Sequence, residues 1–232
     1  MRLLAVDTSG PVCGTAVLED DRVRSELMAQ NKNTHSASLM PMVEQSLTLA
    51  GLTLAEMDAL AVVVGPGSFT GVRIGVATVK ALAHGSGRPC IPVDALEALA
   101  RSAGPAEDCL VCPLQDARAG QVYGACFFRG ERQMEDAALK LEDFLAEARR
   151  LHAGPLLFTG DGADAHREKI CRLLGAEARF PEAPFRFLRP SAVGMVALEK
   201  GTTVDWRALK EFYLRPPNAE KNKKLLEAMR RG

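Results

Sequence analysis

The sequence predicts an α/β protein built from two β-rich lobes with a cleft between them. Three observations support this prediction. Apolar runs of strand length occur in both halves of the chain, segments with helical periodicity follow them, and a stretch with Gly-Pro at residues 102–108 separates the halves. We therefore expect an N-terminal lobe at residues 1–103 and a C-terminal lobe at residues 104–232, with the last helix able to pack back on the N-terminal lobe.

Three antiparallel strands are expected to open the chain. Residues 2–6 form an apolar run that ends at Asp7-Thr8-Ser9-Gly10, and residues 12–18 and 22–29 form the next two strands around a turn at Asp20-Asp21. The carboxylate and the two hydroxyls at the end of the first strand suit a magnesium-bound phosphate. An Asx turn that only closes the hairpin is an open alternative.

A helix is expected at residues 39–50, with Thr34-His35-Ser36 before it and Gly51 as its stop signal. Its apolar residues cover more than one face. The helix can therefore bury one side in its own core and offer another side to a partner. An ordinary core helix is the alternative, and periodicity alone does not separate the two.

Residues 61–75 form the most distinctive stretch of the chain. A β-branched run predicts a buried strand, Gly65-Pro66-Gly67 predicts a tight turn, and Ser68 or Thr70 can cap a helix that runs toward Gly85. The unpaired amides at the start of such a helix attract anions, although the turn could equally serve packing alone. The expected nucleotide or phosphate loop comprises Asp7, Thr8, Ser9, Gly65, Gly67, Ser68 and Thr70.

The second half repeats the order of strands followed by helices. After the boundary, strands are expected at residues 109–114, 121–128 and 155–159 and helices at residues 139–151 and through residues 170–173, while a strand at residues 88–93 and a helix at residues 95–100 are expected to close the first half. Asp116 and Arg118 lie between two paired strands and are candidate cleft residues. Asp116 could face Asp7 across the cleft, and a loop role for each is equally open.

Composition narrows the class of protein. Hydrophobic residues make up 47% of the 232 residues and charged residues 25%, as in ordinary globular proteins. Basic and acidic residues balance at 29 each, so the whole chain exerts no electrostatic pull on nucleic acid. No apolar run is long enough to span a bilayer and no signal peptide is evident, so we expect a cytoplasmic protein with no membrane association.

The six cysteines are expected to be buried thiols, and Cys109 and Cys112, three apart in a strand, are not expected to bind metal.

Several motifs along the chain resemble one known family. They are residues 4–9, Thr34-His35-Ser36 followed by Pro41, residues 65–75, residues 116–118 with Val122-Tyr123, and residues 213–215. Together they resemble the TsaB (YeaZ) family, the partner subunit in bacterial tRNA threonylcarbamoyladenosine biosynthesis, more loosely in the C-terminal lobe. The resemblance implies an actin/Hsp70/sugar-kinase-like (ASKHA) fold of two RNase-H-like lobes with mixed sheets flanked by helices. It also implies work with the catalytic paralogue TsaD and the ATPase TsaE on adenosine 37 of ANN-decoding tRNAs.

The resemblance to TsaD implies that a catalytic member would carry two histidines four residues apart, which could grip one metal ion on a helix face. The four histidines of this chain stand at positions 35, 84, 152 and 166, and position 39 is Leu39. Ser68 has no Gly-x-Ser-x-Gly surroundings. We therefore expect no metal site and no catalytic residue in this chain, and a capping or hydrogen-bonding role for His35.

The favoured hypothesis is a non-catalytic scaffold that binds and activates a TsaD-like subunit. Its expected interface consists of His35, Leu39, Met42, Val43, Ser46, Leu47, Thr70, Arg73, Val76, Ala77 and Lys80, with apolar side chains at the surface. The same helices are expected to form a homodimer when the protein is alone. The alternatives are an ATP-dependent small-molecule kinase of the same fold and a metal-dependent peptidase-like enzyme.

The remaining expectations concern ligands. No cofactor should be required by this chain, although ATP or ADP could bind within the complex. A TsaE-like ATPase is the second expected partner, and tRNA is expected to be contacted through the complex. The basic residues 218–232, with a local charge of +3, could touch tRNA phosphates or form an ordinary solvated end.

Overall fold

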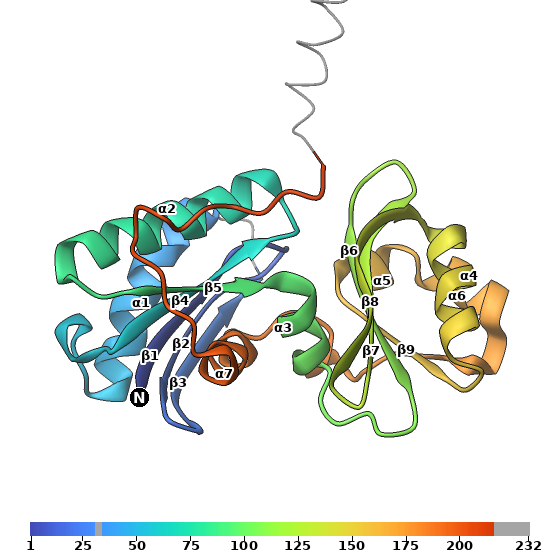
Figure 1. Cartoon of the computed structure of the whole chain (residues 1–232), viewed down its shortest axis with the longest axis horizontal. Helices are drawn as coiled ribbons and strands as arrows, with labels where there is room; N and C mark the ends of the chain where they lie inside the picture. Colours follow the sequence, from blue (N-terminus) through green and yellow to red (C-terminus); the bar gives the residue numbers. More distant parts are fainter. Residues whose placement is uncertain (31–33, 216–232) are drawn as a thin grey trace, which may run out of the picture.

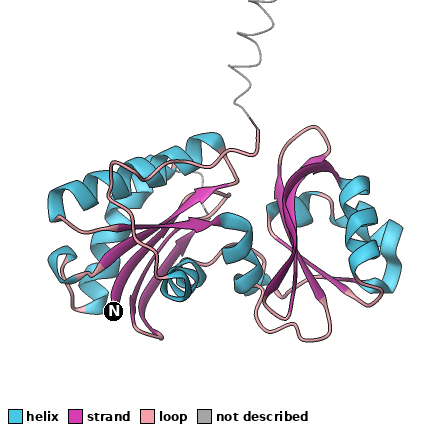
Figure 2. Ribbon diagram, in the orientation of Figure 1, coloured by secondary structure: helices cyan, strands magenta, loops and turns pink. Residues whose placement is uncertain are grey.

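The computed structural model describes residues 1–30 and 34–215 and contains two five-stranded sheets, each flanked by helices (Figures 1 and 2). The first sheet has the order β3-β2-β1-β4-β5. Its strands are β1 (Arg2–Asp7), β2 (Cys13–Glu19), β3 (Arg22–Ala29), β4 (Ala59–Gly65) and β5 (Cys90–Asp94). The hairpin strands pair antiparallel, whereas β4 pairs parallel to both β1 and β5, so the sheet is mixed.

Helices cover both faces of the first sheet. One face carries α1 (His35–Ala50) and α2 (Phe69–Ser86), and the other carries α3 (Ala95–Ser102) and α7 (Pro190–Lys200). A short 3-10 turn, Leu54–Glu56, connects α1 to β4. β1 and β4 are almost wholly buried because each is packed on both faces.

The second sheet repeats the pairing pattern of the first. Its order, β8-β7-β6-β9-β10, again places an antiparallel hairpin next to parallel strands. Its strands are β6 (Leu110–Asp116), β7 (Gln121–Phe128), β8 (Glu131–Lys140), β9 (Leu156–Thr159) and β10 (Ala178–Arg179). Its helices are α4 (Leu141–Leu151), α5 (Asp161–Ala165) and α6 (Arg167–Leu174), with 3-10 turns at Gly175–Glu177 and Ala183–Phe185. The predicted ASKHA arrangement of two mixed sheets with flanking helices is confirmed.

Strand β8 was not predicted from the sequence. The helix expected from residue 139 begins instead at Leu141, because residues 131–140 pair along the whole of β7, from Phe128↔Glu131 to Gln121↔Lys140. β8 lies at the sheet edge and is only partly buried, so its sequence lacks a clean alternation of apolar and polar residues. Its pairing with β7 decides its conformation.

Helix α3 lies between the two sheets (Figure 1). Ala95 and Leu99 belong to the core of the first lobe, while Leu96 and Ala100 pack against Val111 and Phe127 of the second sheet. Asp94 caps this helix, since its carboxylate accepts a hydrogen bond from the Glu97 amide at 2.7 Å. One helix therefore supplies core residues to both lobes.

The chain returns to the first lobe at its end. Helix α7 packs on the first sheet so closely that a Cβ on Gly194 would lie 2.3 Å from a methyl carbon of Leu18. Residues 202–215, which we call the C-terminal strap, then run along α2 (Figure 1). Val204 forms a bridge with Cys90, and Leu209 is fully buried in the first core. The segment nearest the C-terminus that the structure describes therefore completes the N-terminal lobe.

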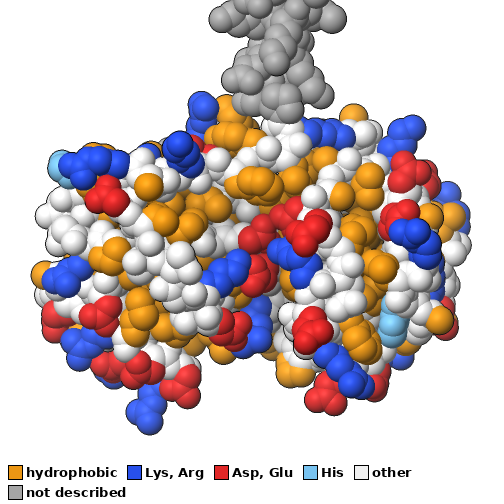
Figure 3. All heavy atoms as spheres, in the orientation of Figure 1, with side chains coloured by type: hydrophobic (Ala, Val, Ile, Leu, Met, Phe, Trp, Pro, Cys, Tyr) orange, Lys and Arg blue, Asp and Glu red, His pale blue; other side chains and the backbone are white. Residues whose placement is uncertain are grey.

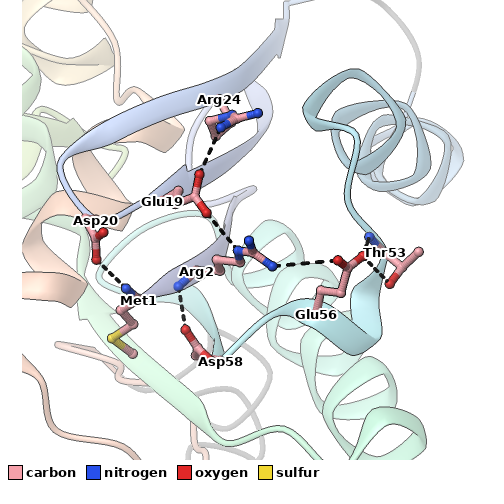
Figure 4. Close-up of polar contacts among 8 residues, drawn as sticks. All are labelled: Met1, Arg2, Glu19, Asp20, Arg24, Thr53, Glu56 and Asp58. Carbon is pink, nitrogen blue, oxygen red and sulfur yellow. Dashed lines mark hydrogen bonds and ion pairs between the residues drawn. The ribbon is translucent and has the colours of Figure 1, made fainter.

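Polar contacts hold the N-terminal end of the first sheet (Figure 4). The Arg2 amide donates to Asp58 at 2.6 Å, and the Arg2 guanidinium pairs with Glu19 at 2.9 Å and with Glu56 at 3.6 Å. Glu56 in turn accepts from the amide and hydroxyl of Thr53, both at 2.8 Å. These contacts are at the surface, where solvent screens the charges, so each adds little to stability. They tie the hairpin to the segment that leads into β4.

Within residues 1–30 and 34–215, none of the helices has the length and hydropathy that crossing a bilayer requires. The basic residues 218–232, for which a contact with tRNA was considered, lie outside the described residues.

Candidate functional site

The glycines of residues 65–75 allow α2 to start against the end of β1. A Cβ on Gly71 would lie 2.0 Å from the Thr8 carbonyl oxygen, and one on Gly75 would lie 2.6 Å from the Thr8 hydroxyl oxygen. A Cβ on Gly67 would lie 2.5 Å from the carbonyl oxygen of Ser9. No side chain fits at these positions, so the glycine spacing is explained by close packing of α2 on the loop after β1.

The start of α2 confirms one of the two predicted caps. The Ser68 hydroxyl oxygen accepts from the Gly71 amide at 3.3 Å, and the Ser68 amide donates to the Ser9 carbonyl at 2.8 Å. Thr70, the alternative cap, lies in the first turn and is exposed. The helix continues to Ser86, one residue beyond the predicted stop at Gly85, and Gly87 follows in the left-handed conformation.

A cleft of about 500 Å³ separates the start of α2 from the second lobe. Gln115 connects its two sides, since Gln115 Nε2 donates to Ser9 Oγ at 3.4 Å. The lining comes from four segments: residues 9–11, residues 66–70, residues 115–118 with Tyr123 and Asp161, and residues 212–215 of the strap. Figure 3 shows acidic and basic side chains gathered along the line where the two lobes meet.

Three residues of the predicted phosphate loop do not line this cleft. Asp7 is 1% exposed and accepts from the Ser9 amide at 2.8 Å, so it forms the Asx turn that was the alternative interpretation. The Thr8 hydroxyl donates to the Gly71 carbonyl at 2.7 Å. Gly65 lies under the strap, where a Cβ would come within 2.2 Å of the Phe212 carbonyl oxygen. The prediction that Asp7, Thr8 and Gly65 surround a phosphate in the cleft is therefore wrong, because the chain's own packing occupies them.

Burial also changes the chemistry of Asp7. Desolvation raises the pKa of its carboxyl to about 6, against the opposing effects of the hydrogen bonds from Ser9 and the nearby His35. His35 Nε2 donates to the Gly10 carbonyl at 2.9 Å and so stabilises the same turn. Asp7 does not face Asp116 across the cleft, because only Asp116 is part of the lining.

The second lobe contributes the acidic side of the cleft. Asp116 accepts from the Arg118 amide at 2.9 Å, and Asp161 lies beside it, with its pKa raised mainly by burial. Gln115 is 4% exposed and its Oε1 has no hydrogen-bond partner among the described residues. Asp116 and Arg118 were predicted as cleft residues and both line it. Gln115, Tyr123 and Asp161 were not among the predicted site residues, since no spacing links the ends of β6 and β9 in the sequence.

The cleft fits a phosphate-bearing ligand only in part. Ser9, Gly67, Ser68 and Thr70 of the predicted loop do line it, next to the first amides of an 18-residue helix. The Mg²⁺-binding chemistry expected from Asp7 and Thr8 is missing from its surface. Among the residues that the structure describes, no group of three or more His, Cys, Asp or Glu side chains is placed to hold a metal ion.

A second groove, of about 880 Å³, lies on the other side of the lobe junction between α3, α7 and the turn after β7. Its floor is apolar and includes Phe127 and Met195. Charges on its rim pair with each other or with neighbours, as in the ion pair between Arg101 and Glu199. This groove contains none of the predicted site residues.

The predicted partner interface divides into buried and exposed residues. Five of its side chains are at most 9% exposed: Leu39, Val43, Ser46, Leu47 and Val76. The four apolar ones belong to the core under α1 and α2, and Ser46 contacts the hydroxyl of Thr15 at 2.6 Å. The prediction that these apolar side chains lie at the surface is therefore wrong. The helical stripe with the strongest apolar pattern packs on the sheet.

The outer stripes of the two helices remain accessible. We call them the α1–α2 face and define it by the exposed residues Ala37, Met40, Pro41, Glu44, Thr48, Thr70, Arg73, Ala77 and Ala81. Thr70, Arg73 and Ala77 of the predicted interface belong to it, while His35, Met42 and Lys80 are partly buried at its border. Met40 is 37% exposed, and Leu49 on the same helix is 58% exposed. Most of these side chains are small or apolar, as in surfaces that pack against another protein.

The strap borders this face along α2. Lys80 Nζ donates to the Leu209 carbonyl at 3.0 Å, and Arg73 Nε donates to the Tyr213 hydroxyl at 3.1 Å. Phe69 stacks on Tyr213 with ring centroids 5.1 Å apart. Phe69 was not among the predicted site residues, and nothing in its local sequence indicates a contact so distant along the chain.

The comparisons with known proteins agree with one another. The family described as "TsaD: tRNA N6-adenosine threonylcarbamoyltransferase" matches residues 25–195. The chain is 35% identical to the tRNA threonylcarbamoyladenosine biosynthesis protein TsaB of Bacillus subtilis, over 95% of this chain and 96% of that protein. It is 33% identical to the protein of the same name from Escherichia coli, over 93% and 95% of the two chains. Among solved structures, YeaZ from Pseudomonas aeruginosa matches with a TM-score of 0.73 at 29% identity, over 92% of this chain and 99% of that one.

Proposed function

The chain belongs to the TsaB (YeaZ) family and has a role in tRNA threonylcarbamoyladenosine biosynthesis, and on this premise we propose that it is the non-catalytic partner of a TsaD-like transferase. In the proposed assembly the chain binds and activates that transferase. A TsaE-like ATPase joins them, and the product is N6-threonylcarbamoyladenosine at position 37 of ANN-decoding tRNAs. The tRNA is contacted through the complex, in the cytoplasm.

The α1–α2 face is the observation that carries this proposal. It presents small and apolar side chains on two adjacent helices, and a second pair of helices can pack closely on such a surface. The match of residues 25–195 to the TsaD family supports a partner with a related fold, because related folds can pair through equivalent helices. We propose that the same face forms a homodimer when the transferase is absent.

The state of His35 supports a non-catalytic role. Its ring donates to the Gly10 carbonyl at 2.9 Å, and the residue four positions later, Leu39, is 1% exposed in the core. A metal-binding pair of histidines on this turn would require a polar side chain at that buried position. We propose that the chain requires no cofactor itself and that any ATP or ADP binds within the complex, where Ser9, Ser68 and Thr70 line the cleft.

The test is light scattering after size-exclusion chromatography of the protein mixed with the TsaD-like subunit from the same cell. The variant carries Met40→Glu and Ala77→Glu, both in the α1–α2 face. We expect the wild type to form a hetero-complex and the variant to remain apart, because two buried carboxylates without partners disfavour association. A threonylcarbamoyl-transfer assay should show activity only when both subunits are present.

Leu173→Glu is the matched control, since Leu173 is 53% exposed on α6 in the other lobe. It should leave the complex intact. A wild-type protein that forms no complex, with or without ATP, would contradict the proposal. A complex that survives the double substitution would place the interface elsewhere.

A further inference from the structure

Arg73 is the most strongly organised cation of the α1–α2 face. Its guanidinium carbon lies 4.0 Å from the centroid of the Phe69 ring, one helical turn earlier. Arg73 Nε donates to the Tyr213 hydroxyl at 3.1 Å, and the rings of Phe69 and Tyr213 lie 5.1 Å apart. A long exposed side chain is therefore held in one orientation by two aromatic rings.

The strap that supplies Tyr213 is itself fixed by the core of the first lobe. The Phe212 amide donates to the Val64 carbonyl at 2.7 Å, directly over Gly65. Leu209 is fully buried, and its carbonyl accepts from Lys80. The contacts of the strap with β4 and α2 therefore fix the position of the Tyr213 hydroxyl. The start of α2 also lines the cleft, and the outer stripe of α2 is part of the α1–α2 face.

The two terminal nitrogens of Arg73 have no hydrogen-bond or ion-pair partner among residues 1–30 and 34–215. Within the part of the chain that the structure describes, the contacts of this guanidinium are those with Phe69 and Tyr213, and neither is an acid. Many other arginines pair with carboxylates, as Arg2 does with Glu19 and Arg101 does with Glu199. A pre-ordered guanidinium with both terminal nitrogens free matches the geometry of a bidentate carboxylate.

We propose that Arg73 binds a carboxylate of the transferase subunit and that Tyr213 of the strap is its positioning residue. The inference rests on the proposed function, since it names a contact within the same face. The neighbouring exposed residues on α2, namely Thr70, Ala77 and Ala81, are small and uncharged. Nucleic acid binding depends on several cations along a phosphate track, whereas this surface offers one cation amid small side chains and fits a packed helix that carries an acid.

The experiment measures the dissociation constant of the complex with the TsaD-like subunit at about 50 and about 300 mM salt, which changes the screening of exposed charges. Arg73→Ala should raise the dissociation constant about tenfold at low salt and flatten its salt dependence, because the charge pair is lost. Arg73→Lys should recover part of the affinity and the salt dependence, since it keeps the charge but not the fork. Tyr213→Phe should raise the dissociation constant about threefold and keep the salt dependence, because only the ordering of the charge is lost.

Lys210→Ala is the matched control, since Lys210 is an exposed cation of the same strap. It should leave the dissociation constant unchanged, and thermal unfolding should confirm that all variants fold. The inference is overturned if Arg73→Ala binds as tightly as the wild type, if Lys210→Ala weakens binding equally, or if Arg73→Ala weakens binding without altering its salt dependence. It is also overturned if Arg73 affects binding of unmodified tRNA to the isolated protein but not binding of the subunit. A wild-type protein that does not bind the subunit at all would instead contradict the proposed function.

Discussion

The two lobes have the same pattern of strand pairing, and in each a glycine-containing turn follows one of the parallel strands, β4 in the first lobe and β9 in the second. They differ in the helix that follows this turn. In the first lobe Gly67 packs against the end of β1, and in the second lobe Gly160 packs against the end of β6, where a Cβ would lie 2.2 Å from the Leu114 carbonyl oxygen. The first turn leads into the 18-residue α2, whereas the second leads into the five-residue α5. In the part of the chain that the structure describes, only the first lobe therefore has a helix of this length with an exposed outer stripe.

This difference separates what the fold requires from what the function requires. The glycine turns serve the same packing role in both lobes, because each brings a helix start against the end of a central strand. Among the described residues of the second lobe, where α4, α5 and α6 are shorter, the α1–α2 face has no equivalent. We therefore expect substitutions in the glycine turns to affect folding, and substitutions on the α1–α2 face to affect association.

The largest effect is expected from Gly67→Val and Gly160→Val. Both glycines have positive φ, 156° and 99°, and a Cβ on either would lie within 2.5 Å of a backbone oxygen, so valine cannot be accommodated. Each change should lower the free energy of unfolding by about 3 kcal/mol or more, as measured by urea denaturation. Gly85→Val, at an open position near the end of α2, should cost much less. A tolerated Gly160→Val beside a damaging Gly67→Val would show that the two turns are not equivalent.

A smaller effect is expected from Asp7→Asn, and it should depend on pH. The carboxyl of Asp7 has a pKa of about 6 in the folded protein, above its value in the unfolded chain, so the folded state binds the proton more tightly. Stability should therefore fall as the pH rises from about 4 to about 6, and then change little from this group. Asp7→Asn keeps an oxygen for the Ser9 amide and should remove this decline of about 3 kcal/mol, measured as the unfolding free energy at several pH values.

If the unfolding free energy of Asp7→Asn depends on pH as that of the wild type does, Asp7 is not the group that causes the decline. Asp161→Asn offers the comparison in the second lobe. Burial also raises the pKa of Asp161, but this carboxylate accepts several backbone hydrogen bonds that favour its charged form. Its substitution should therefore alter the pH dependence less than that of Asp7.

The smallest effect is expected from Arg132→Ala, which tests how firmly the lobes are joined. Arg132 on β8 reaches Asp94 of the first lobe at 3.1 Å and also pairs with Asp136. The pKa of Asp136 is raised by burial and by the neighbouring Asp94, so both carboxylates depend on this arginine for compensation. Arg132 is 23% exposed, and its loss should cost about 1–2 kcal/mol.

Calorimetry checks this prediction, because weaker coupling between the lobes should broaden the unfolding transition or split it. Arg150→Ala removes an ion pair that is 76% exposed on the arginine side, and it should change stability by less than about 0.5 kcal/mol. An Arg132→Ala protein with an unchanged, sharp transition would show that the apolar contacts of α3 join the lobes without this arginine.

Much of the first lobe could be predicted from its sequence, because its signals are local. Val62–Val64 with Gly65 marked β4, Ser68 marked the start of α2, and Gly51 marked the end of α1. The edge strand β8 could not be predicted in this way, since its partner β7 determines it. The same limit applies to the candidate site. Helical periodicity identified α1 and α2 but did not separate a partner-binding face from a core face, and the expected partner interface included Val43 and Val76, which both pack in the core.

The cleft shows the limit most clearly. Asp7, Thr8 and Ser9 were all expected in the phosphate loop, yet of the three only Ser9 lines the cleft. All three are buried, and their hydrogen-bond partners separate them: Asp7 accepts from the Ser9 amide and Thr8 donates to the Gly71 carbonyl, whereas the Ser9 hydroxyl accepts from Gln115 of the second lobe. The contacts of Thr8 and Ser9 join residues more than 60 positions apart. The contact between Arg73 and Tyr213 joins residues 140 positions apart, so it could not be predicted from the local sequence either.

The return of α7 and the strap to the first sheet has a consequence for the order in which the protein can fold during synthesis. The second sheet is built from one continuous segment, from Leu110 in β6 to Arg179 in β10. One face of the first sheet has only α3 as its helical cover until α7 has left the ribosome, and its core lacks Leu209 for longer still. The lobe that is translated second can therefore complete its core first, while the lobe that is translated first waits for the last part of the chain.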